Sequence, residues 1–124
     1  MFNSPKFNVS GIRVVCQFHS QGLDQDISDH YATLTATFDL PKNPKKASVL
    51  NQQSPVFKLS VFVYEGAVEK KHLIGESSAA RKLDDEDRQQ FKMHMTVHRV
   101  VSLEELIFSE ICPNKIIVKI VVEV

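Results

Sequence analysis

Residues 57–75 read FKLSVFVYEGAVEKKHLIG, and this stretch predicts an apolar strand, a charged loop and a second strand. Its first part is dense in aromatic and β-branched residues, which suit a pleated surface that is buried on at least one face. The loop ends in three adjacent basic side chains, Lys70, Lys71 and His72. We therefore expect a β-hairpin with a basic tip, and we take these three residues as a candidate binding loop.

The segments before this hairpin also predict strands. In residues 7–18, and again in residues 31–40, apolar side chains fall at every second position, as in a strand with one buried face. The expected inward-facing residues are Ile12, Val14, Cys16, Phe18, Ala32, Leu34, Ala36 and Phe38. A short strand is also expected at residues 47–50.

After the hairpin, the acidic run at residues 84–87 predicts a solvated turn or a short helix. Residues 91–101 alternate again, with Phe91, Met93, Met95 and Val97 expected to face inward. Ser102 is followed three residues later by Glu105, which is the spacing of a capping box and predicts a short helix. Residues 115–124 predict a β-branched closing strand, with Ile117 or its neighbours buried.

Many short strands without long alternating helices predict an all-β fold, an antiparallel β-sandwich of about eight strands with one or two short helices in its loops. A chain of 124 residues is long enough for one core. We expect residues 7–124 to form a single domain and residues 1–6 to be a leader.

The charges give no broad electrostatic signal. Fifteen basic residues balance fifteen acidic residues, so the attraction typical of nucleic-acid binders is missing. Positive charge is concentrated locally at Lys42, Lys45, Lys46 and Lys58, which we take as a candidate basic patch. This patch, or the loop with Lys70 and Lys71, could contact anionic lipid headgroups or could simply keep the rim of a sheet soluble.

The sequence contains no evident catalytic, metal or cofactor motif, and we expect a protein that is not an enzyme. Cys16 and Cys112 lack the close spacing of zinc ligands, and we expect both to be reduced core thiols. Pairing of Cys16 with a histidine as nucleophile and base is the less favoured alternative. His94 and His98 would share a helix face but are far apart on a strand. The four glycines are not clustered into a phosphate-binding loop.

The chain also lacks the pattern of a signal peptide and any apolar run long enough to span a bilayer. These features predict a cytoplasmic location, with peripheral attachment to a membrane as the alternative.

Three short motifs resemble the C-two domain, the calcium- and lipid-binding sandwich of protein kinase C and synaptotagmins. Residues 27–38, ISDHYATLTATF, are similar to the segment that opens a strand with Ser-Asp-Pro-Tyr, with His30 in place of the proline. Residues 54–57, SPVF, and residues 73–75, LIG, follow in the family's order. The resemblance spans most of the chain and implies the same sandwich fold.

The departures from this family concern calcium. Where calcium-binding members carry aspartates, this chain has Tyr64, Gly66 and His72. Carboxylates remain only in the first loop, at Asp24, Asp26 and Asp29. Because calcium takes six to eight oxygen ligands, we expect no calcium site. The sequence therefore predicts a calcium-independent protein-interaction module within a larger assembly, with a phospholipid-binding module as the alternative.

Overall fold

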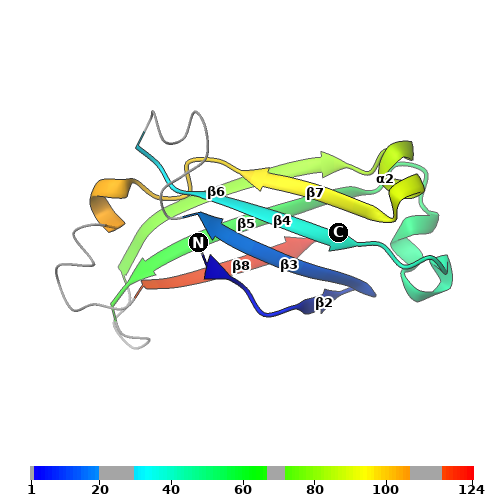
Figure 1. Ribbon diagram of the computed structural model, residues 1–124, viewed down its shortest axis with the longest axis horizontal. Helices are drawn as coiled ribbons and strands as arrows, with labels where there is room; N and C mark the ends of the chain where they lie inside the picture. Colours follow the sequence, from blue (N-terminus) through cyan, green and yellow to red (C-terminus); the bar gives the residue numbers. More distant parts are fainter. Residues whose placement is uncertain (1, 20–29, 67–71, 107–115) are drawn as a thin grey trace.

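The computed structural model describes residues 2–19, 30–66, 72–106 and 116–124, and two antiparallel β-sheets make up most of this described part (Figure 1). The sheets are open, and their arrangement is consistent with a β-sandwich. The larger sheet contains β1 (Phe2–Asn3), β2 (Phe7–Val9), β3 (Ile12–His19), β4 (Thr33–Asp39) and β7 (Lys92–Val97). The smaller sheet contains β5 (Val56–Glu65), β6 (His72–Lys82) and β8 (Ile116–Glu123).

The two sheets differ in width. In the larger sheet, β1 and β2 lie one after the other along the same edge of β3, and β4 and β7 follow on the other side, so the sheet is four strand positions wide. In the smaller sheet, β5 pairs with β6 on one side and with β8 on the other. Within the described residues, the smaller sheet is therefore three strands wide.

Short helical segments lie at the ends of the sheets. They are η1 (Pro44–Lys46), η2 (Ser48–Asn51), α2 (Asp85–Gln90) and a helical turn at residues 103–106. The backbone N–H of Glu105 donates to Oγ of Ser102 at 3.3 Å, which confirms that Ser102 caps this turn.

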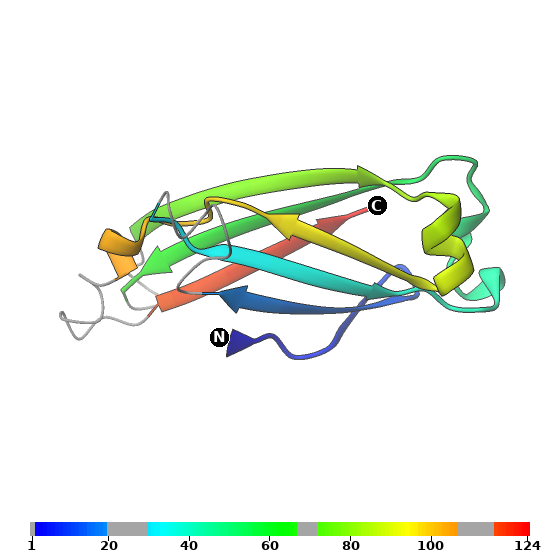
Figure 2. The same cartoon turned by 45° about the horizontal axis from the view of Figure 1, so that its top comes forward.

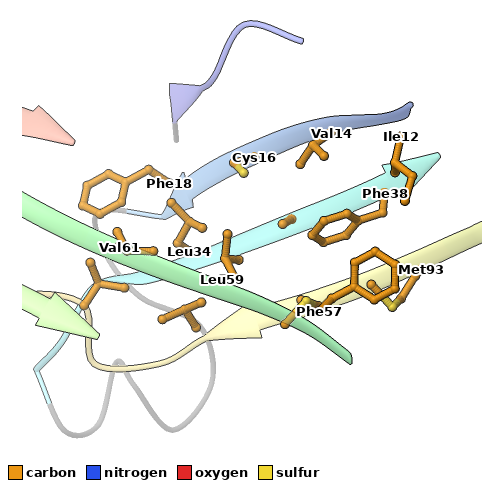
Figure 3. Close-up of a cluster of buried hydrophobic side chains, with 14 of the residues drawn as sticks. Ile12, Val14, Cys16, Phe18, Leu34, Phe38, Phe57, Leu59, Val61 and Met93 are labelled. Atoms are coloured by element: carbon orange, nitrogen blue, oxygen red, sulfur yellow. The ribbon is translucent and has the colours of Figure 1, made fainter. Parts of the chain in front are cut away.

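The core lies between the two sheets (Figure 3). Every residue expected to face inward from residues 7–18 and 31–40 is buried, as are Met93, Met95 and Val97 of β7. Phe38 of β4 and Phe57 of β5 meet edge to face across the two layers, with ring centroids 5.6 Å apart. The period-two pattern thus predicted the buried faces correctly, and the β5–β6 pairing confirms the hairpin at residues 57–75.

Other local predictions were wrong. Residues 7–18 form two strands because Ser10 and Gly11 both have positive φ, as in the two-residue turn that joins β2 to β3. Residues 47–50, expected to form a strand, belong mostly to the 3-10 helix η2. Phe91 does not face the core: it is 41% exposed and caps α2 in the left-handed conformation. Residues 1–6, expected as a leader, include β1, which pairs with β3.

One side of the two sheets is closed by contacts between β6 and β7. Oγ of Ser77 donates to the carbonyl oxygen of His98 at 2.8 Å, and Nη1 of Arg81 donates to that of His94 at 2.6 Å. Gly75 of β6 packs so tightly that a Cβ atom there would lie 2.7 Å from Cβ of Val101 and against the carbonyl oxygen of Val100. Glycine at this position therefore permits the close approach of β6 to the segment that follows β7.

The contact at Gly75 predicts the effect of adding one methyl group. Gly75→Ala should lower the free energy of unfolding by roughly 1–3 kcal/mol, because backbone atoms must move to admit the side chain. Ser78→Ala is the matched control, since it changes an exposed residue of the same strand and should cost less than about 0.5 kcal/mol. Urea unfolding of both variants measures the difference. Equal stability of the two variants would contradict the close contact.

Candidate functional site

The side opposite the β6–β7 contacts is open. The two sheets are aligned so that β6 lies along β7. Because the larger sheet is one strand position wider, β1 and β2 at its other edge extend beyond β8 (Figures 1 and 2). We call the region bounded by β1, β2 and β8 the open side. Within the part of the chain that the structure describes, no strand of the smaller sheet lies opposite β1 and β2.

The apolar residues that border the open side are only half buried. Phe7 and Val9 of β2 pair with Val14 and Ile12 of β3 and share their face of the sheet, but Val14 and Ile12 are completely buried. On β8 the half-buried residues Val118, Ile120 and Val122 pair with Val63, Val61 and Leu59 of β5, which are also completely buried. Both borders of the open side thus present apolar side chains that a further strand would cover.

Between residues 3–5 and β8 lies a groove of about 470 Å³. The described residues that line it come from five separate parts of the chain: Asn3, Ser4, Pro5, Cys16, Phe18, Leu34, Leu106, Ile116, Val118 and Ile120. None of them is charged, and most are aliphatic or aromatic. The groove is therefore suited to apolar groups, with polar atoms near residues 3–5 at its rim. No local motif in the sequence pointed to it.

Cys16 lines this groove as a neutral thiol. Burial raises the pKa of Cys16 to about 11, although a hydrogen bond with Ser4 acts in the opposite direction. The side chain is 1% exposed, and the thiol is protonated at neutral pH. Since the thiolate is the reactive form, the geometry favours the core assignment of Cys16 over a nucleophilic one. Cys112 lies outside the described residues.

The position of β8 corrects the expectation that Ile117 or its neighbours are buried. No residue of β8 is fully buried, and Lys119 in the middle of the strand is exposed. Within the described residues, β8 is an edge strand of the smaller sheet and pairs with β5 alone, so no further strand covers its outer side.

The predicted binding loop is only partly described. Lys70 and Lys71 lie outside the described residues. His72 is the first residue of β6, is exposed, and lies opposite Glu65 at the end of β5. The structure thus places His72 at the base of the hairpin tip.

The residues at the expected calcium positions lie near this tip. Tyr64 is in β5 opposite Leu73, Gly66 follows β5 with a φ of 107°, and His72 begins β6. None of these three supplies a carboxylate. Asp24, Asp26 and Asp29 lie outside the described residues. Among the residues with described positions, no group of three or more His, Cys, Asp or Glu side chains could hold a metal ion, His94 and His98 included.

The predicted basic patch is divided between two places. Lys42, Lys45 and Lys46 lie in the exposed connection between β4 and η2, where the Lys42 ammonium lies 5.8 Å from the centroid of the Phe91 ring. Lys58 is on β5, opposite Glu123 of β8 in the sheet register. The three loop lysines remain a local cationic group, and Lys58 has an acidic neighbour.

An acidic helix lies beside the loop lysines. Arg88 of α2 donates to the carbonyl oxygens of Leu50 and Gln52, at 2.6 and 2.9 Å, which joins α2 to the end of the basic connection. Asp85 and Glu86 of this helix are exposed. This end of the molecule therefore carries both signs of charge.

The start of α2 is fixed by a capping box with an added arginine. The Asp84 carboxylate accepts from the backbone N–H of Asp87 at 2.8 Å, and the Asp87 carboxylate accepts from that of Asp84 at 3.1 Å. Nη2 of Arg81 lies 2.9 Å from Oδ1 of the buried Asp87. The Asp87 N–H, and to a smaller degree Arg81, hold the pKa of Asp84 below its ordinary value of 3.8. These contacts stabilise the first turn of α2, so the group has a structural role as a helix cap.

Comparison with known proteins gave no match to a family model, to a curated protein or to a solved structure. Among the residues that the structure describes, no helix is long and apolar enough to cross a bilayer.

The lowered pKa of Asp84 predicts a pH-dependent contribution to stability. Because the folded-state pKa lies below the unfolded one, the stabilisation is present above the ordinary carboxyl pKa and is lost as pH falls through the lowered value. Asp84→Ala should therefore lower the Tm at pH 7, and the Tm difference from the wild type should shrink below about pH 4.

Asp84→Ser is the matched control, because serine keeps a capping oxygen without titrating in this range. Its Tm at pH 7 should exceed that of Asp84→Ala, and the difference between the two variants should not shrink in acid. Thermal unfolding followed by circular dichroism provides the values. A gap between Asp84→Ala and wild type that stays constant or widens in acid would contradict the assigned role of the carboxylate.

Proposed function

We propose that this chain is a calcium-independent protein-interaction module with a C-two-like fold. The observation that carries the proposal is the open side, where half-buried apolar side chains of β8 line a groove whose described lining residues carry no charge, and where Phe7 and Val9 of β2 are also only half buried. Contiguous exposed apolar surface on a soluble domain commonly marks an interaction site. A rim of polar groups around an apolar centre is also the usual anatomy of a protein interface.

Two further observations support the C-two-like part of the proposal. Two antiparallel sheets and the β5–β6 hairpin agree with the architecture that the resemblance implies. Near the hairpin tip, Tyr64, Gly66 and His72 offer no carboxylate where calcium-binding members of the family have aspartates. A calcium ion would lack most of the six to eight oxygen ligands that it takes.

Binding to anionic phospholipids is the second candidate, favoured by the exposed cluster of Lys42, Lys45 and Lys46. Each lysine near an anionic surface contributes about 1 kcal/mol. The acidic residues of α2 lie beside this cluster and repel the same surface, and the formal net charge of the chain is zero. The charge distribution therefore supports protein binding more than membrane binding.

Capture of a protein partner tests the proposed function. The purified domain, immobilised and exposed to native extract, should retain at least one partner in near-equimolar amount, equally well with calcium or with a calcium chelator. Reciprocal capture by the identified partner is the control. Calorimetry should show no stoichiometric calcium binding at micromolar concentration. Partner binding that requires calcium, or a tight calcium site, would overturn the proposal.

The same assay separates the candidate contact surfaces. If the loop contacts the partner, the combined variant Lys70→Ala, Lys71→Ala, His72→Ala should lose capture while keeping the wild-type Tm. Unchanged capture would remove the loop as the contact surface. Sedimentation with phosphatidylserine vesicles tests the second candidate: binding at low salt that disappears at high salt would favour it, because salt screens electrostatic attachment.

A further inference from the structure

We propose that the open side is a strand-addition site, which binds an extended segment of a partner protein as a fourth strand next to β8. The proposal rests on the interaction function proposed above, and it specifies the surface and the form of the partner. Three features of the described residues lead to it: the edge of β8, the apolar groove behind that edge, and the unequal width of the two sheets.

The first feature is the backbone of β8. In the described part of the chain, β8 pairs with β5 alone, along residues 116–123. In an antiparallel pair, alternate residues direct their N–H and C=O groups toward the neighbouring strand, and the residues between them direct theirs away. The outer edge of β8 therefore presents a row of donors and acceptors of the kind to which an extended peptide can add.

The second feature is the groove, which lies where the inward side chains of an added strand would project. Ile116, Val118 and Ile120 of β8 form one wall, while Phe18 of β3 and Leu34 of β4 are on the other sheet. A strand that pairs with β8 would direct every second side chain into this space. Because the described lining residues carry no charge, those side chains should be apolar, and the alternate ones, which face solvent, can be polar.

The third feature, the unequal width of the two sheets, indicates whether a single strand or a second copy of the domain occupies the open side. If two β8 edges paired antiparallel, each copy would bring its own β1 and β2, which extend one strand position beyond β8. The β1 and β2 strands of one copy would then occupy the place of β3 in the other. A lone extended segment meets no such obstacle and would make the smaller sheet four strands wide, like the larger one.

The area available along the edge also disfavours a second copy. An eight-residue strand is about 27 Å long, and a sheet with its side chains is about 10 Å thick, so edge-to-edge contact covers roughly 270 Å² per copy. A stable dimer usually buries about 800 Å² per partner. An inserted segment instead contacts the edge of β8, the groove and the inner side of β2 together.

A synthetic peptide as long as β8 tests the proposal on the unmodified domain. It carries valine or isoleucine at every second position and threonine or lysine between them, with blocked ends and a fluorescent label. Fluorescence anisotropy should show saturable binding, and the NMR signals of β8 amides should shift. A peptide of the same composition with its apolar residues grouped in one block should bind at least about tenfold more weakly.

Backbone methylation tests whether the peptide pairs as a strand. Two versions of the peptide carry N-methyl groups on alternate residues, one version on each edge. The version methylated on the edge that faces β8 should lose at least about tenfold in affinity, since several hydrogen bonds are removed, while the other version binds as before. Equal binding of both versions would overturn strand addition, even if the side chains enter the groove.

Two neighbouring residues of β8 provide matched protein variants. Ile120→Lys places a charge in the groove wall, whereas Val121→Lys places the same charge on the opposite face of the same half-buried edge strand. Ile120→Lys should abolish peptide binding and Val121→Lys should preserve it, with circular dichroism and Tm showing that both variants fold. If Ile120→Lys does not fold, the methylated peptides decide the question on the wild-type domain.

The outcomes distinguish this proposal from the proposed function. If a partner is captured from extract but neither the peptide nor a partner segment shifts the NMR signals of the β8 amides, strand addition is wrong and the interaction function stands. If decanoate binds in the groove and the peptide does not, the site takes an apolar small molecule and the proposal is overturned. Formation of a dimer through β8 would also overturn it.

Discussion

Phe38 and Phe57 meet edge to face in the apolar layer that joins the two sheets, and the packing of one sheet on the other depends on this layer. The strands β2, β3, β4, β5, β7 and β8 contribute alternate residues to it, so each of them must keep one face turned inward. Burial of this layer removes apolar surface from water and supplies the main favourable free energy of folding. Because the described sheets differ in width, side chains of both sheets cover each other in the middle of this layer. Beside β8, part of the larger sheet has no strand opposite it.

The two borders of the layer are therefore unlike each other. Along β6 and β7, side chains of one sheet donate to backbone carbonyl groups beside the other, and Gly75 lets the chains approach closely. Along β2 and β8, apolar side chains remain half buried, and those of β8 line a groove. A closed border stabilises the domain by itself, whereas an open one leaves surface that can gain from contact with another molecule. This contrast links the fold to the proposed interaction function.

Local alternation in the sequence was sufficient to predict which residues face inward in β3, β4 and β7, because a strand buries one face with a period of two. It also located the hairpin formed by β5 and β6. The break at Ser10 and Gly11 and the departure of Phe91 from the alternating pattern depend on left-handed backbone conformations, which residues other than glycine adopt infrequently. Alternation alone therefore predicted one strand at residues 7–18, where the structure has two, and an inward-facing Phe91, which is exposed.

The candidate groove was not predictable in the same way. Its lining comes from residues 3–5, β3, β4, Leu106 and β8, which are distant in sequence and meet only through the order of strands in the two sheets. Strand order is a property of the whole chain and leaves no local motif. The basic residues were identified as candidates from the sequence because clustered charges can be recognised within a short segment. In the structure, however, Lys58 is separated from the other patch lysines.

In the described part of the chain, β8 pairs with β5 alone and lies beside an open groove, and the proposed interaction depends on this free edge. Amide hydrogen exchange of the isotope-labelled domain, followed by NMR, tests it residue by residue along residues 116–123. We predict alternation: amides that donate to β5 exchange slowly, and those that face the open side exchange rapidly. Uniformly slow exchange along β8, equal to that of the central strand β5, would contradict it.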